Sequence, residues 1–195
     1  MKGWNAEFMS PDEVVGLGLA AVGRHVLVHR MAVLVNCEAI HLADHVRIDP
    51  FVLISAGERV SLGRHVHIAT GVSIIGTAPV DIGDFVSISQ GSRLLSSTDD
   101  FSGEVMTGAT VPIRYRDVKA APISIGRHAV VATGSVVLPG ASVGEGAVVG
   151  ALSLVTRRLE PWTIHVGIPT RPLKPRARAA LKLEEQLRRD ETPAA

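Results

Sequence analysis

Aliphatic residues recur along this chain at fixed intervals of six and eight positions. From Val28 to Leu94, each set of two sixes and one eight makes a period of 20 residues. After a gap, aliphatics from Ile125 to Val155 follow at intervals of six throughout. A sandwich of short strands has no reason to keep such a period, whereas a solenoid of stacked coils requires one. The repeat therefore predicts an all-β solenoid.

The same repeat predicts the shape of each coil. A second small aliphatic often stands two residues earlier, as at Val60 and Val66, so the pair faces one side of a short strand. Stretches such as "LGRH" and "IGDF" turn the corners. Three hexads close a triangular coil, and the seventeen hexads make nearly six coils. The two extra residues of each early coil fall at one corner, where the long segment after Leu94 is also inserted.

Composition narrows the class of protein. The 195 residues carry a formal net charge of +1, which gives no support for a nucleic-acid binder. Cys37 is the only cysteine, which fits a reducing cytoplasm. We find no secretory h-region and no apolar run of about 18 residues. We therefore expect a cytoplasmic protein with no membrane insertion.

The chain divides into three expected parts. These are an N-terminal segment with a short helix (1–22), the β-helix (23–175) with a loop insertion (96–122), and a C-terminal helix and tail (176–195). The stretch "SPDEVVGLGL" (10–19) offers a serine N-cap, then proline, then acids in the first turn. The stretch "PRARAALKLEEQLRRD" (175–190) has basic residues in its last turn. We expect both helices to cap the open ends of the coil stack, where strand edges are otherwise exposed.

The hexads resemble the [LIV]-G-x-x-x-x pattern of the hexapeptide-repeat acyltransferases across roughly residues 23–175. The most specific stretches are "ISIGRHAVVATGSVVLPGASVGEGAVVGALSLVTRRLEPW" and "VGIPTRPLKPR". The resemblance implies a left-handed parallel β-helix and a homotrimer with active sites between subunits. It also implies acyl transfer from acetyl-CoA or a related thioester. The left hand comes from the resemblance alone.

The resemblance also implies where coenzyme A would lie. Small residues of the late coils would border the thiol and pantetheine arm: Thr133, Gly150, Ala151 and Thr156. Such residues let backbone amides approach a ligand closely. Arg171 and Lys174 in "PTRPLK", with Arg157 as a weaker candidate, would meet the phosphates. The alternatives are corner packing for the small residues and a solvated basic tail for the cations.

The loop insertion departs from the family's pattern. Sugar O-acetyltransferases of this family carry a histidine base in a T-x-H-P-like stretch, but here that slot holds Asp99, followed by Asp100. No histidine stands between 68 and 127. A carboxylate with a pKa of about 3.9 is a poor base for a hydroxyl, unless burial or its neighbour raises that value. An amine titrates near 8 and is partly neutral at pH 7, so it needs no strong base. The acid pair therefore favours an amine nucleophile.

The loop "SSTDDFSGEVMTGATVPIRYRDVKAAPI" also resembles that of bacterial surface-polysaccharide acyltransferases acting on nucleotide-linked 4-amino-4,6-dideoxy sugars. The resemblance implies a nucleotide-linked amino sugar as the acceptor. Arg114 and Arg116, with Lys119, are then candidates to meet a diphosphate. Ordinary solvated loop charges are the alternative.

The histidines have two interpretations. His25, His45 and His65 stand one 20-residue period apart and, with His128, are expected to be corner residues, so we expect no metal. His67, in "VHI", should point outward and is the second candidate base. The leading hypothesis is amino-sugar acylation with Asp99, His67 or Asp100 handling the proton. The alternatives are an O-acetyltransferase using His67 and a non-catalytic scaffold.

Overall fold

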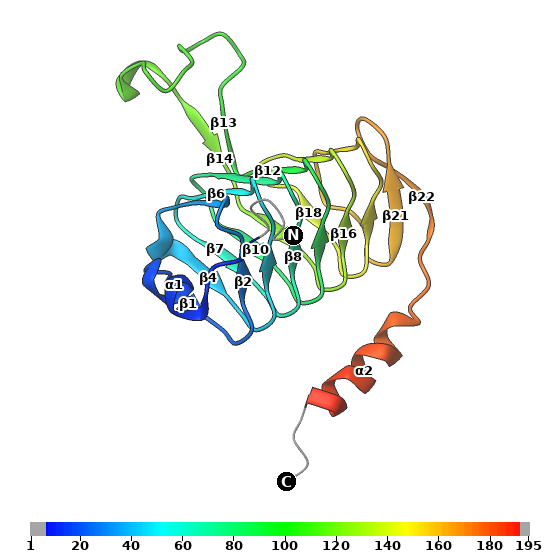
Figure 1. The fold of residues 1–195 in the computed structure, drawn as a ribbon. Coiled ribbons are helices and arrows are strands. Elements are labelled where there is room, and N and C mark those ends of the chain that lie inside the picture. Colours follow the sequence, from blue (N-terminus) through cyan, green and yellow to red (C-terminus); the bar gives the residue numbers. More distant parts are fainter. Residues whose placement is uncertain (1–6, 192–195) are drawn as a thin grey trace, which may run out of the picture.

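The computed structural model describes residues 7–191 and confirms the predicted β-helix. Three parallel sheets form the sides of a triangular prism (Figure 1), with about seven turns. The repeat predicted nearly six coils, which is fewer than the structure contains. It missed the outermost strands, which do not carry the counted aliphatics: β1 (Ala21–Val22) and β21 (Thr163–Val166).

Each sheet collects one strand from every coil, in the order of the chain. Sheet 1 contains β1, β4 (Ile40–Leu42), β7 (Val60–Leu62), β10 (Val80–Ile82), β15 (Ile123–Ile125) and β18 (Ser142–Val143). Sheet 2 contains β2 (Leu27–Val28), β5 (Arg47–Ile48), β8 (His67–Ile68), β11 (Ser87–Ile88), β16 (Val130–Val131), β19 (Val148–Val149), β21 and β22 (Arg171–Pro175). Sheet 3 contains β3 (Val33–Val35), β6 (Leu53–Ala56), β9 (Ser73–Gly76), β12 (Arg93–Leu95), β17 (Val136–Val137) and β20 (Leu154–Val155).

The register explains the 20-residue period. Val60 pairs with Val80, and Ile68 pairs with Ile88, so equivalent aliphatics of successive coils lie directly above one another. These side chains fill the interior of the prism: Ile48, Ile68, Ile88, Leu94 and Val131 are all fully buried. No coil buries its aliphatics alone, and stacking supplies the missing neighbours.

The three corners of the prism differ, and we name each of them. The ring corner, between sheets 1 and 2, carries stacked rings: His25, His45, His65, Phe85 and His128. The groove corner, between sheets 2 and 3, carries small residues such as Ala69, Ser89 and Ala132 together with the exposed Met31, Phe51 and Leu152. The loop corner, between sheets 3 and 1, carries the extra residues of each early coil, with a short 3-10 helix η1 (Cys37–Ala39) in the first. The histidines are thus corner residues, as expected.

Glycine at the ring corner permits close stacking of the coils. A Cβ added at Gly126 would lie 2.5 Å from the backbone nitrogen of Glu145 in the next coil. Gly126→Ala must therefore push two coils apart, and we expect a loss of about 1–3 kcal/mol in the free energy of unfolding. Gly16→Ala is the matched control, because a Cβ there meets nothing within 4 Å. Equal midpoints of the two variants in urea unfolding would contradict this account.

The N-terminal helix covers the first coil, as expected. Helix α1 (Pro11–Gly16) begins at Ser10 with a capping box closed by Glu13, and its Val14 belongs to the buried core. Arg30 of the first coil holds the Glu13 carboxylate through two hydrogen bonds of 2.7 Å. Residues 1–6 of the expected N-terminal segment and 192–195 of the expected tail lie outside the described residues.

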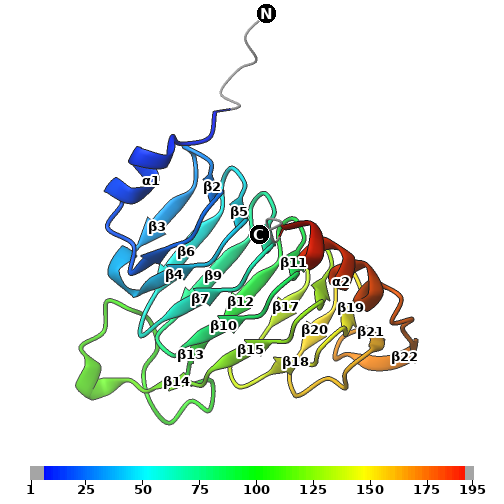
Figure 2. The ribbon, with the colours of Figure 1, turned by 90° about the horizontal axis from the view of Figure 1, so that it is seen from below.

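The expectation that the C-terminal helix caps the coil stack is wrong. Helix α2 (Ala180–Glu191) runs back along the outside of the ring corner (Figure 2). Ion pairs hold it there, because Glu184 meets Arg127 at 3.0 Å and Glu191 meets Arg64 at 2.8 Å. It starts later than expected because Pro175 ends strand β22, which pairs antiparallel with β21. No helix among residues 7–191 is long and apolar enough to cross a membrane.

Candidate active site

An arm leaves the loop corner after β12 and projects away from the prism (Figure 1). Strands β13 (Ser97–Asp99) and β14 (Val118–Ala120) form its antiparallel stem, and Asp99 lies opposite Val118. A short 3-10 helix, η2 (Ile113–Tyr115), lies between them. The stem borders a cavity of about 510 Å³, lined by Thr77, Ser97, Thr98, Asp99, Ile113, Arg116 and Val118.

The two adjacent acids have different surroundings. Asp99 lines the cavity, and its carboxylate accepts a hydrogen bond from the backbone N–H of Gly108 at 3.3 Å. Asp100 instead accepts hydrogen bonds from the hydroxyl and backbone N–H of Ser102, and lies 4.0 Å from the Lys119 ammonium. No hydrogen bond joins the two carboxylates. The two carboxyl groups therefore do not share a proton, and Asp99 is the acid that a molecule in the cavity can contact.

The loop cations also separate. Arg116 lines the cavity with Asp99, and its Nε is buried without a hydrogen-bond partner among the described residues. Arg114 places its guanidinium 4.7 Å from the centre of the Tyr115 ring, beside a different hollow of about 420 Å³. A hydrogen bond to Asp117 raises the pKa of Lys119 and occupies its ammonium. Of the candidate diphosphate ligands, Arg116 is the one that lines the Asp99 cavity.

The groove corner holds three of the small residues singled out in the late coils. Gly150 needs to be small, since an added Cβ would lie 2.6 Å from Cγ1 of Val166. Its carbonyl accepts a hydrogen bond from the Ser135 hydroxyl at 2.8 Å. Thr133 and Ala151 are exposed beside it, and the Thr133 hydroxyl donates to the Gln90 side-chain oxygen at 3.2 Å. The exposed side chain of Leu152 follows these small residues at the same corner.

The remaining candidates lie elsewhere. Thr156 and Arg157 are exposed at the loop corner, after β20, and not beside Gly150. Arg171 and Lys174 stand on the exposed strand β22, at the late end of sheet 2. The Arg171 guanidinium donates to the carbonyl of Thr170 at 3.0 Å, and Lys174 is exposed on the same strand. The late coils therefore carry cations on two separate edges.

His67 points outward from sheet 2, as its place between two buried residues requires. Its Nε2 lies 2.8 Å from Oδ2 of Asp49, and Arg47 donates to the other oxygen of that carboxylate at 2.7 Å. The loop corner lies on the opposite side of the prism, between sheets 3 and 1. A single chain therefore does not bring His67 and Asp99 together.

Comparison with known proteins assigns the family. No protein-family model matches the chain. A dTDP-4-amino-4,6-dideoxy-D-glucose acyltransferase of Escherichia coli is 37% identical over 178 residues, covering 91% of this chain and 93% of the relative. The chain belongs to the hexapeptide-repeat acyltransferases. Family membership confirms the left-handed β-helix that the resemblance implied.

Solved structures extend the similarity to the whole acyltransferase. AntD, an N-acyltransferase from Bacillus cereus, is 33% identical, with a TM-score of 0.90 over 94% of this chain and 97% of that chain. It was solved with dTDP and 3-hydroxybutyryl-CoA. A serine-to-cysteine variant of AntD, with the same identity, TM-score and coverage, was solved with dTDP-4-amino-4,6-dideoxyglucose and coenzyme A.

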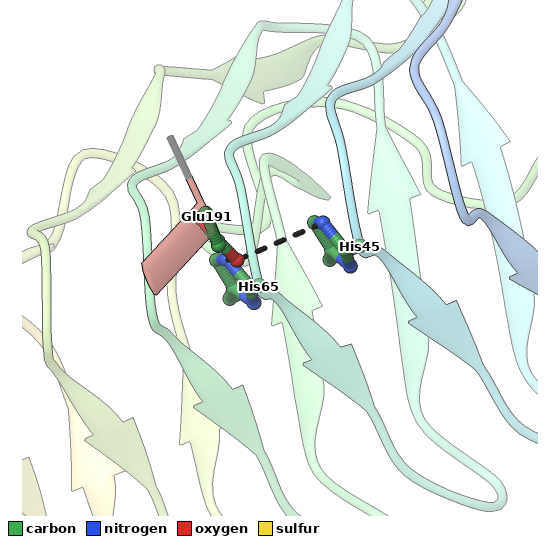
Figure 3. A group of neighbouring side chains, drawn as sticks. All are labelled: His45, His65 and Glu191. Atoms are coloured by element: carbon green, nitrogen blue, oxygen red, sulfur yellow. Dashed lines mark ion pairs between the residues drawn. The ribbon is translucent and has the colours of Figure 1, made fainter. Parts of the chain in front are cut away.

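One group of side chains in the acyltransferase has the composition of a metal site. Ligand atoms of His45, His65 and Glu191 lie within 4.8 Å of one another (Figure 3). The two imidazole rings are stacked, however, 4.5 Å apart and within 3° of parallel. An ion in the plane of one ring would lie out of the plane of the other, so both rings cannot ligate it within the stack. The Glu191 carboxylate instead joins α2 to the ring corner.

Sequence reasoning missed two residues beside the candidate groups. Asp49 holds His67, and Thr77 lines the Asp99 cavity. The 20-residue period contains the missing signal, because a residue about 20 positions away lies one coil away. Asp49 precedes His67 by 18 positions, and Thr77 precedes Asp99 by 22.

Proposed function

We propose that this acyltransferase transfers an acyl group from acetyl-CoA, or a related acyl-CoA, to the amino group of a dTDP-linked 4-amino-4,6-dideoxy sugar. The observation that carries the proposal is the Asp99 cavity, in which a carboxylate takes the place of the usual histidine base beside the buried Nε of Arg116. Similarity to the E. coli enzyme and to AntD across nearly the whole chain supports the same acceptor. The product would serve surface polysaccharide synthesis.

The chemistry suits a carboxylate. The neutral amine attacks the thioester carbonyl, a C–N bond forms, and backbone N–H groups stabilise the developing oxyanion. The C–S bond then breaks, and the proton lost by nitrogen passes to the departing thiolate. Asp99 accepts a hydrogen bond from the amine, which directs the nitrogen lone pair at the carbonyl. Arg116 meets the sugar nucleotide's diphosphate.

We further propose a homotrimer with active sites between subunits. The arm and the groove corner lie on different sides of one prism, so a second copy would bring the Asp99 of one chain to the groove corner of its neighbour. The arm also exposes apolar side chains that a partner would cover: Phe101, Met106, Ile113 and Tyr115. Light scattering should give three times the mass of the 20.6 kDa chain. A monomeric mass in an active preparation would contradict shared sites.

Coenzyme A is proposed to lie along the groove corner. Thr133, Gly150 and Ala151 would border its pantetheine arm, with Thr156 of a neighbouring chain across the cleft. Arg171, Lys174 and Arg157 would meet its phosphates. The single cysteine Cys37 fits the proposed cytoplasmic location.

The test offers acetyl-CoA with matched amino and hydroxyl sugars on dTDP, following free thiol and product mass. We expect acylation of the amino sugar alone, with a rate that rises with pH up to about 8 as the substrate amine loses its proton. Transfer to hydroxyl sugars alone would favour the second candidate, an O-acetyltransferase. That candidate rests on the His67–Asp49 hydrogen bond, which has the form of a base and its orienting group.

A further inference from the structure

The His67–Asp49 pair lies at the early end of the groove corner. Backbone hydrogen bonds between 2.8 and 3.0 Å join successive coils along this corner. They run from Asp49 N to Ile68 O, from Ala69 N to Ile88 O, from Ser89 N to Val131 O and from Ala132 N to Val149 O. Gly150 stands on the next layer. The residues at the equivalent position of the coils between them, Ala69, Ser89 and Ala132, are all small, so this row of the corner leaves backbone available for an extended ligand arm that runs from Gly150 toward His67.

The Asp49 carboxylate is built into this face. Only 14% of its side chain is exposed, against 43% for His67. Burial raises the pKa of the Asp49 carboxyl, but hydrogen bonds from His67 and Arg47 outweigh that effect and hold the pKa below its usual value. The Arg47 guanidinium also contacts the Phe8 ring, at 4.9 Å from the ring centre. Asp49 is therefore an ionised carboxylate whose position is fixed by its hydrogen bonds.

An ionised carboxylate only accepts hydrogen bonds. Since Oδ2 of Asp49 lies 2.8 Å from Nε2 of His67, that nitrogen must carry the hydrogen. The neutral imidazole then has its lone pair on Nδ1, which makes no hydrogen bond to any described residue. Asp49 thus selects one tautomer and leaves one nitrogen as the proton acceptor.

We propose that Asp49 is a positioning residue, which fixes His67 with Nδ1 as the acceptor for the proton that the attacking nitrogen loses. This inference rests on the proposed amino-sugar acylation. The acceptor amine has two N–H bonds: Asp99 from a neighbouring chain holds one, and His67 Nδ1 holds the other. After the C–N bond forms, Nδ1 takes the proton from nitrogen. It gives the proton to the coenzyme A thiolate as the C–S bond breaks, so no external acid or base is consumed.

The test compares Asp49→Asn and His67→Gln with the wild type, using acetyl-CoA and dTDP-4-amino-4,6-dideoxyglucose. Asparagine keeps the size of aspartate but can present an N–H to His67, which permits the wrong tautomer. We expect kcat to fall about tenfold in Asp49→Asn with KM for acetyl-CoA unchanged. We expect the double variant to be no slower than His67→Gln, because the two residues act as one unit. Asp81→Asn is the control for an Asp-to-Asn change away from the groove corner, since Asp81 is 48% exposed and pairs with Arg59 at 2.8 Å on sheet 1.

A second measurement needs no substrate. Nitrogen NMR of the imidazoles should show His67 as the Nε2–H tautomer in the wild type, with that preference lost in Asp49→Asn. An Nδ1–H tautomer in the wild type, or an unchanged kcat of Asp49→Asn from pH 6 to 9, would overturn the inference alone. A wild type that acylates no amino sugar would overturn both the inference and the proposed function.

Discussion

Replacing Asp99 by asparagine is expected to lower kcat/KM for the amino sugar by about a hundredfold or more. The substitution keeps the shape of the side chain and its contact with Gly108 N, but it removes the charge that orients the amine. Misplacing a reacting group by about 1 Å costs roughly 10²-fold in rate. Because deprotonation of the substrate amine causes the rate to rise with pH, the variant should show the same pH dependence, with a lower rate at every pH. Steady-state kinetics from pH 6 to 9 measure both.

Two neighbouring acids of the arm provide the comparison. Asp117→Asn is the control, because its carboxylate is exposed and pairs with Lys119 outside the cavity, and we expect its rate to stay within about twofold of the wild type. The rate of Asp100→Asn should lie between the rates of the other two variants, since the Asp100 carboxylate stabilises the arm by accepting hydrogen bonds from Ser102. If Asp99→Asn matches Asp117→Asn at every pH, Asp99 has no part in orienting the amine.

The β-helix was predictable because its cause is repeated in the chain. Each coil must place an aliphatic over the last, so Ile48, Ile68 and Ile88 mark the coils by themselves. The place of the arm was predictable for the same reason, because the corner that already holds extra residues tolerates more. The conformation of the arm was not, since residues 96–122 contain no repeat to fix which acid faces the cavity.

The course of α2 was not predictable either. Its position depends on contacts between residues far apart in the chain, such as Arg127 with Glu184 and Arg64 with Glu191. Charges on a solvated helix look the same in sequence whether or not they find partners. The outward orientation of His67 was predictable from the alternation of residues along the strand. Its hydrogen bond to Asp49 could have been predicted only by asking which outward-facing residue stands about 20 positions away, in the neighbouring coil.

Replacing Glu184 by alanine is expected to release α2 from the ring corner. Glu184 is the buried residue of the described helix, and its carboxylate lies 3.0 Å from Arg127 and 2.6 Å from His128. Removing one partner of a fully buried ion pair costs about 3–5 kcal/mol, and the loss here is smaller because water reaches the Arg127 side chain, which is 38% exposed. Little apolar contact offsets that cost, because Leu183 is mostly exposed. Tryptic cleavage within residues 176–189 should therefore accelerate at least about tenfold, with the β-helix intact.

Glu185→Ala is the matched control, because the Glu185 side chain makes no ion pair with the described residues. Burial raises the pKa of Glu184, but hydrogen bonds from His128 and Arg188 and the charge of Arg127 outweigh it, so the pKa lies below the ordinary 4.5. A carboxyl with a lowered pKa stabilises the docked helix above pH 4.5, and this contribution is lost as the pH falls through the lowered value. Amide exchange of α2 in the wild type should consequently speed up in acid before that of the β-helix core. If α2 stays as protected as the core in acid, or if Glu184→Ala and Glu185→Ala are cleaved equally fast, these ion pairs do not hold the helix.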